Sequence, residues 1–189
     1  MIQKSKRRER IMASLIDFFV FFPMILFNLG LVYLGLFYQI IGNLLSLLFG
    51  FYYYVYYVFK NETTIGKKNQ NLFILSFDET RVTYIQCLKR YLGLNIINII
   101  QSIIISVIIV KSSDVGYDKL SLLDKLNYTV SKNKDIIMPM TYLGQIWIFI
   151  NLLFLLFEKN RRTLADYFAG TMVGRKVEDE IDTIGKEVE

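Results

Sequence analysis

The acid in the first apolar segment is the residue whose chemistry most needs an explanation. Asp17 is the only charge in segment 11–33, and a carboxylate at the centre of a spanning helix costs about 2.5 to 3.5 kcal/mol, so it is normally buried with a partner. Asp17 lies six residues from the start of the segment, about 9 Å deep at 1.5 Å per residue. Its nearest candidate partner is Arg10, seven residues earlier and about 20° away on the helix face.

Uncharged polar residues extend this pattern. Asn28 follows Asp17 by eleven residues on nearly the same face. A second line lies in segment 92–110, where residues recur every three or four positions on one helix face: Asn95, Asn98, Ser102 and Ser106, with Gln101 beside them. Such lines either hydrogen-bond helices together, at about 0.6 kcal/mol per bond on average, or border a hydrated path for an ion or small solute.

A third group of charges follows the last apolar segment. Arg162 is expected at the membrane surface, where basic residues anchor helix ends. Asp166 comes four residues later, a spacing that favours a weak ion pair on a helix.

The residue types that are missing exclude several classes of chemistry. The chain has no histidine and a single cysteine, Cys87, so it offers no imidazole base, no internal disulfide and no usual zinc site. No phosphate-binding loop, nucleophile elbow or zinc-protease motif occurs either. We therefore expect no enzyme, no metal and no cofactor.

The composition indicates what must position these residues. Of 189 residues, 53% are hydrophobic and 21% are charged, with a mean hydropathy of +0.37, and the charges are segregated. Four apolar segments, at about 11–33, 36–59, 92–110 and 136–157, have the length that about 30 Å of hydrocarbon requires. The sequence predicts an all-α polytopic membrane protein with four transmembrane helices in a bundle.

The connections follow from the same pattern. Residues 11–59 are too long for one crossing, so a tight turn is expected at 34–36 or at 39–43. The apolar run after the basic N-terminus is too long for a signal peptide, so we expect it to be a retained helix. Loop 60–90 alternates loosely between apolar and polar residues over 71–84, which suggests an interfacial helix or hairpin, and 111–135 is expected to be an outer loop.

Basic residues set the orientation. All eight arginines lie in the N-terminal segment, in loop 60–90 or after residue 157, and the positive-inside rule then places both termini in the cytoplasm. The predicted location is a bacterial cell membrane, with one membrane domain over 1–175 and an acidic tail over 176–189. Topology explains the net charge of +5, so no nucleic-acid partner is expected.

Four short motifs, in order along nearly the whole chain, resemble those of the RDD family of bacterial membrane proteins. They are RERIMASLID with Arg10, Ala13 and Asp17; TTIGKK with Gly66, Lys67 and Lys68; CLKRYLG with Arg90; and RRTLADYFAGTMV with Arg162, Asp166, Gly170 and Thr171. The chain departs from the pattern at Ala165, where a histidine is frequent, and in its fourth helix and its outer loop of 25 residues.

The resemblance leaves two functions open, since some members are reported as sodium/proton antiporters and others accompany secretion, protease or stress systems. We favour an accessory, regulatory or immunity partner of a larger membrane system, in which Arg10, Asp17 and Asp166 form a structural charge cluster, because these charges lie near the interface and transporter sites cluster at the midplane. The alternative is a monovalent cation/proton antiporter or transport subunit that uses Asp17. Either would work in the bilayer with a membrane-protein partner or as a homo-oligomer.

Overall fold

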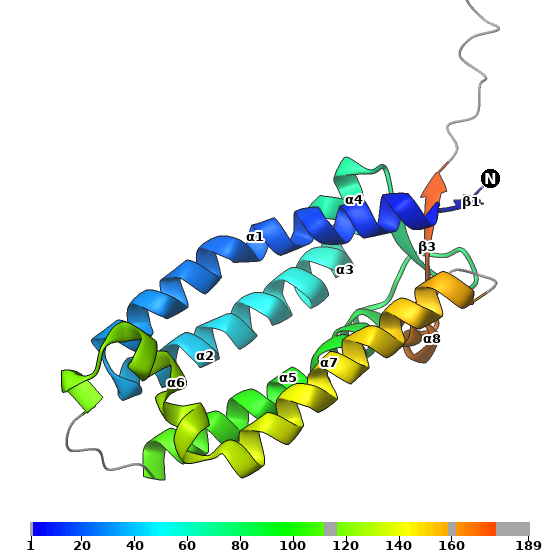
Figure 1. Cartoon of the computed structure of the whole chain (residues 1–189). Helices are drawn as coiled ribbons and strands as arrows, with labels where there is room; N and C mark the ends of the chain where they lie inside the picture. Colours follow the sequence, from blue (N-terminus) through cyan, green and yellow to red (C-terminus); the bar gives the residue numbers. More distant parts are fainter. Residues whose placement is uncertain (1, 112–116, 159–161, 177–189) are drawn as a thin grey trace, which may run out of the picture.

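The computed structural model describes residues 2–111, 117–158 and 162–176. Four helical rods run between the two ends of the molecule (Figure 1), and each is long and apolar enough to cross a membrane. They are α1 (Arg7–Leu34), the continuous rod of α2 (Leu36–Phe51), the π-helix η1 (Tyr52–Tyr57) and α3 (Val58–Asn61), then α5 (Tyr84–Lys111) and α7 (Lys134–Phe157). The predicted four-helix, all-α architecture is confirmed.

The first two rods form a tight hairpin. Gly35 has a φ of 147°, which a residue with a side chain rarely adopts, and its amide donates to the carbonyl of Leu31 at 3.3 Å. The turn therefore lies at the first of the two expected places, 34–36. Helix α1 packs on α2, α2 on α5, and α5 on α7.

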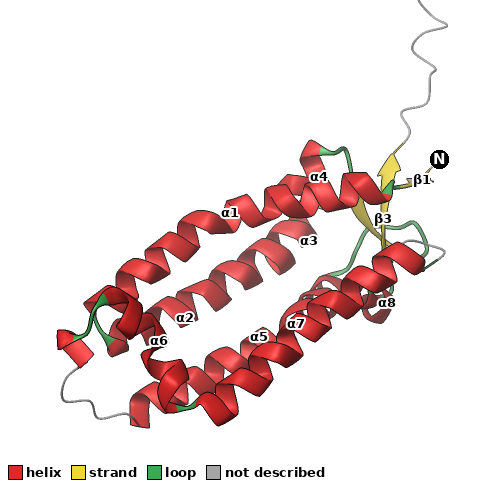
Figure 2. Ribbon diagram, in the orientation of Figure 1, coloured by secondary structure: helices red, strands yellow, loops and turns green. Residues whose placement is uncertain are grey.

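One end of the bundle is covered by short elements that we call the cap. They are α4 (Ile65–Asn69), α8 (Leu164–Ala169), β1 (Ile2–Lys4), β2 (Phe73–Ser76) and β3 (Thr171–Lys176). The strands form one antiparallel sheet in the order β1-β3-β2, with Ile74 opposite Val173 (Figure 2 shows the strands gathered at this end). The suggested interfacial helix is absent between residues 72 and 83. Of the suggested hairpin there is one antiparallel bridge, between Leu75 and Arg81, while β2 pairs along its length with β3 from the far end of the sequence.

The buried apolar core lies next to the cap. Leu72 and Ile74 are fully buried against Val58, Val82 and Cys87, whereas few side chains in the apolar windows of the four long helices are buried. This distribution follows if lipid surrounds the helices, because lipid tails give apolar side chains no reason to leave the surface.

Two boundaries differ from the sequence prediction. Helix α5 begins at Tyr84 and not near 92, because Thr83 and Gln86 cap its first turn reciprocally. Segment 111–135 contains the short 3-10 helix η2 (Tyr117–Lys119) and the helix α6 (Leu122–Lys132). The Nζ of Lys125 holds α6 on the end of α1 by donating to the carbonyl of Tyr33 at 2.9 Å.

Candidate functional site: two buried carboxylates under the cap

Asp166 is the centre of the first group of charges. It is fully buried, and its two oxygens meet two arginines, with Arg10 Nη2 at 2.6 Å and Arg90 Nε at 2.7 Å. Burial by itself favours the neutral acid, but Arg90 and Arg10 outweigh it and hold the pKa of Asp166 well below its usual range. Asp166 is therefore an ionised carboxylate that joins α1, α5 and α8.

The same aspartate also starts α8. The amide of Thr163 donates to Asp166 Oδ2 and the amide of Asp166 donates to Thr163 Oγ1, both at 3.1 Å. This reciprocal arrangement is a capping box, which satisfies amides at a helix start. Gly170 then ends the helix with a φ of 64°. Local sequence thus fixes the direction in which Asp166 points.

Asp17 is the centre of the second group. Its Oδ1 accepts from the hydroxyl of Tyr53 at 2.5 Å and the amide of Gly66 at 2.8 Å, and its Oδ2 accepts from Thr64 Oγ1 at 2.7 Å. The ammonium of Lys67 lies 3.6 Å from Oδ2. A carboxylate that is only 3% exposed thereby ties α1 to the first turn of α4 and to η1.

The glycine of the loop motif makes this contact possible. A Cβ on Gly66 would overlap the carbonyl oxygen of Ala13 and would lie 2.7 Å from Asp17 Oδ1. Since real Cβ atoms do not approach other atoms so closely, α4 reaches α1 only with glycine at this position.

Lys67 is a buried cation with long contacts. It is 8% exposed, and its Nζ lies 3.4 Å from Thr64 Oγ1 in addition to the 3.6 Å separation from Asp17. Burial, aided by Arg90, lowers the pKa of Lys67 to about 8, although Asp17 acts in the opposite direction. Its neighbour Lys68 is exposed.

Two ion pairs expected from spacing are replaced by others. The ion pair of Arg10 is with Asp166 and that of Asp17 is with Lys67, so the expected nearest pairing of Arg10 with Asp17 is wrong. Arg162 pairs with Glu158 at 3.6 Å and not with Asp166, and its guanidinium lies over the rings of Phe77 and Tyr167. Tertiary contacts between distant segments therefore override the local helical spacing.

The structure separates the predicted polar residues into two sets. Asn95, Asn98 and Ser102 line a cavity of about 270 Å³ between α2 and α5, together with Asn43 and Ser46. Asn28 reaches that group because its amide donates to Ser46 Oγ at 2.7 Å. Gln101 faces α7 instead, where its amide donates to Thr141 Oγ1 at 3.1 Å.

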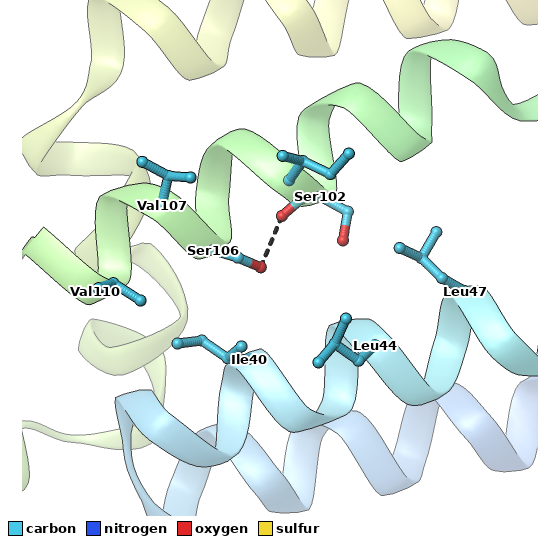
Figure 3. Close-up of a pocket in the computed structure, with 8 residues that line it drawn as sticks. Ile40, Leu44, Leu47, Ser102, Ser106, Val107 and Val110 are labelled. Carbon is cyan, nitrogen blue, oxygen red and sulfur yellow. Dashed lines mark hydrogen bonds between the residues drawn. The ribbon is translucent and has the colours of Figure 1, made fainter.

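Three cavities follow one another along the molecule. A polar cavity of about 220 Å³ under the cap is bordered by Arg10, Asp17, Lys67 and Arg90, and it shares Tyr54 with the 270 Å³ cavity. A third cavity, of about 350 Å³, lies towards the other end and shares Leu47 and Ser102 with the second. Apolar side chains of α2 and α5 line it together with Ser102 and Ser106 (Figure 3).

Sequence reasoning missed several of the residues that complete the site. Tyr53 and Thr64 lie 36 and 47 positions from the carboxylate they bind, so no local spacing points to the pairing. Thr64 did carry a local signal, since its side chain caps α4 by accepting from the amide of Lys67 at 3.2 Å. Among the residues described, no group of acids and cysteine is placed to hold a metal ion.

Comparison with known proteins gives one match. The model of the RDD family matches residues 5–170, a range that includes both carboxylate groups and all the basic residues around them. No curated protein and no solved structure matches the chain.

Proposed function

The chain belongs to the RDD family and has four helices able to span a membrane, and from this premise we propose that it is an accessory, regulatory or immunity partner of a larger membrane system. The Arg/Asp cluster has a structural role in this proposal: it holds a rigid cap on one end of the bundle. The proposal puts that cap in the cytoplasm, on the strength of the positive-inside rule applied to the basic segments.

The observation that carries the proposal is that both site carboxylates are buried among protein cations and hydrogen-bond donors. Asp166 has Arg10, Arg90 and the amide of Thr163, and Asp17 has donors from η1, α4 and the turn before α4. A buried pair of this kind fixes one arrangement of segments without adding much net stability. This is the behaviour expected of a scaffold.

Charge also disfavours a cation at this place. Arg10, Lys67 and Arg90 face the cavity beside Asp17, and two unit charges 4 Å apart interact by about 4 kcal/mol at an effective dielectric constant of 20. A cation that approached Asp17 would also approach the ammonium of Lys67, which lies 3.6 Å from Asp17 Oδ2, and it would displace hydrogen bonds that Asp17 already accepts.

An exposed aromatic surface supports the partner part of the proposal. Phe77, Tyr167 and Phe168 are 56%, 61% and 61% exposed; Phe77 follows β2, and the other two residues belong to α8, so all three lie outside the four long helices. Exposed apolar patches of this type mark contacts with protein or membrane. We assign this surface to contact with a partner protein.

The test compares the isolated chain with its complex. The full chain, purified alone and reconstituted with a pH-sensitive dye inside the liposomes, should give no proton flux when a sodium or potassium gradient is imposed. In cells, it should co-purify with one partner at fixed stoichiometry, and Phe168→Asp should reduce that recovery while the chain remains folded. Cation-dependent flux by the chain alone would overturn the proposal.

The second candidate is a monovalent cation/proton antiporter. It is favoured by the row of cavities, since the cavity bordered by Asn43, Asn95 and Asn98 and the one beside Asp17 share Tyr54 as a lining residue. In that case Asp17→Asn should abolish the flux, and Asp78→Asn, an exposed acid in the cap, should leave it unchanged. Equal flux in both variants would exclude Asp17 as the coupling group.

A further inference from the structure

The cavity of about 220 Å³ under the cap carries an excess of positive charge. Arg10, Lys67 and Arg90 border it together with one carboxylate, Asp17. Asp166 neutralises one further charge from behind the arginines. Among the described residues named here, three are basic and two are acidic, in a place where a buried charge is costly without partners.

Lys67 makes the longest printed polar contacts of the three cations that border the cavity. The arginines meet Asp166 at 2.6 and 2.7 Å, whereas the ammonium of Lys67 lies 3.4 Å from Thr64 Oγ1 and 3.6 Å from Asp17 Oδ2. A charge-assisted N–H···O bond is about 2.7 to 2.9 Å long. An ammonium has three N–H groups, so Lys67 can donate strongly to a further acceptor in the cavity.

The size and position of the cavity narrow the class of acceptor. One water molecule takes up about 30 Å³ in the liquid. The cavity of about 220 Å³ therefore has room for a tetrahedral oxyanion. The cavity lies at the cap end of α1, between that helix and the ends of α5 and α7, and the exposed residue Ser14 is at its edge. Leu94 and Leu155 complete the wall, so it offers cations for an anionic group and apolar surface for attached carbon chains.

We propose that this cavity binds a phosphate group, which accepts a hydrogen bond from the Lys67 ammonium and lies between Arg10 and Arg90. A phosphate has several acceptor oxygens and can meet cations from three elements at once, which chloride cannot do. The group comes either from a phospholipid headgroup that enters from the membrane or from free inorganic phosphate. The site is independent of the partner assigned above, because the aromatic surface of Phe77, Tyr167 and Phe168 contributes no residue to it.

The experiment measures thermal unfolding of the full chain in a maltoside detergent, which contains no phosphate, by the fluorescence of its single tryptophan, Trp147. The added probes are inorganic phosphate, dioctanoyl phosphatidylglycerol and dioctanoylglycerol, with sodium chloride at matched ionic strength. We expect a phosphate-bearing probe to raise the unfolding temperature in a saturable way, and dioctanoylglycerol and chloride to have no such effect. Stabilisation by phosphatidylglycerol alone identifies a lipid as the source, and stabilisation by both phosphate probes identifies a site for the phosphate group itself.

Two variants and a matched control decide whether the cavity is responsible. Lys67→Gln should raise the probe concentration needed for half-maximal stabilisation about tenfold or more, since it removes a charge-assisted contact. Lys68→Gln removes the same charge from the exposed neighbouring position on α4 and should respond like the wild type. Ser14→Leu keeps every charge but narrows the cavity, and it should also weaken the response. The proposal is overturned if no phosphate probe stabilises the wild type, or if Lys67→Gln and Lys68→Gln respond equally.

Discussion

Asp166 and Asp17 are both buried carboxylates, but their partners differ in kind. Asp166 is held by two guanidinium groups, and Asp17 by a phenol, a hydroxyl, a backbone amide and a more distant ammonium. Removing the charge of Asp166 would leave two buried arginines without their carboxylate. Removing the charge of Asp17 would leave mostly neutral hydrogen-bond donors without a charged acceptor.

Asp166→Asn should therefore be strongly destabilising. Breaking a buried ion pair by removing one partner costs about 3 to 5 kcal/mol, and here Arg10 and Arg90 both lose the carboxylate of Asp166. We expect a large fall in the unfolding temperature of the detergent-purified chain. Asp78→Asn, at an exposed cap position, should change stability by less than about 0.5 kcal/mol, and equal effects of the two substitutions would contradict the structural role of Asp166.

Lys67 should give the protein a distinct alkaline pH dependence. Its pKa falls from an ordinary value of 10.5 to about 8 in the folded chain, so between these values the unfolded chain binds more protons than the folded one. Stability contributed by this group must then rise with pH from about 8 to about 10.5 and stay constant below that window. The charged and titratable groups that face Lys67 are Arg10 and Asp17 from α1, Tyr54 from η1, Arg90 from α5 and Asp166 from α8.

The measurement is the difference in unfolding temperature between the wild type and Lys67→Gln across pH 7 to 10.5, because other groups that titrate in this range affect both proteins. The unfolding temperature of the wild type should rise relative to that of Lys67→Gln as the pH rises. A flat difference, or one of opposite sign, would mean that Lys67 is not a desolvated cation in the folded chain.

At the scale of elements, the short helices of the cap act as connectors. Helix α4 has five residues and α8 has six, lengths at which an isolated helix is unstable in water. Thr64 and Thr163 cap them, and Asp17 and Asp166 attach them to the long helices. Each carboxylate thus accepts hydrogen bonds from amides at the start of a short helix and fixes the position of that helix against the long helices.

Gly66→Ala tests the attachment of α4 to α1. The added methyl would overlap the carbonyl oxygen of Ala13, so α4 would have to move and Asp17 would lose the amide of Gly66. Overpacking of this kind costs about 1 to 3 kcal/mol, which should appear as a lower unfolding temperature.

Gly30→Ala is the matched control, because a Cβ at Gly30 meets nothing within 4 Å. Alanine is favoured over glycine inside a helix by about 1 kcal/mol, so this substitution should be neutral or stabilising. If Gly66→Ala were tolerated as well as Gly30→Ala, α4 would not be held against α1 in the way the structure indicates.

At the scale of the whole molecule, the two ends differ. The cap end contains the buried apolar core, the sheet and both carboxylate groups, while the other end is closed by α6 against α1 (Figure 1). Strands β1 and β3 pair with each other, so these two strands must lie on the same side of a membrane that the four helices cross. Which side this is depends on the basic residues and the positive-inside rule.

Cysteine labelling in intact cells tests that orientation. The native Cys87 is 1% exposed and should not react, so single cysteines can be placed at exposed positions of either end. With a membrane-impermeant maleimide, Lys119→Cys near α6 should be labelled, and Asp78→Cys in the cap should be labelled only after the membrane is opened. The reverse pattern would place the cap outside the cell.

The sequence by itself determined the features that depend on composition and local spacing. Long uncharged stretches are stable only in hydrocarbon, so the four helices and their approximate bounds could be predicted. The cost of Asp17 in such a stretch marked it as a residue with partners. The short motifs around Gly66, Lys67, Arg90 and Asp166 marked the segments that meet.

Only the tertiary structure decided which of these residues pair. Local helical geometry favoured Arg10 with Asp17 and Arg162 with Asp166, but Arg10 reaches Asp166 across 156 positions and Asp17 reaches Thr64 across 47. Strand β2 likewise pairs with β3, nearly 100 positions later. The physical reason is that a buried charge takes the partner that best replaces its lost hydration, and that partner can come from any segment the fold brings close.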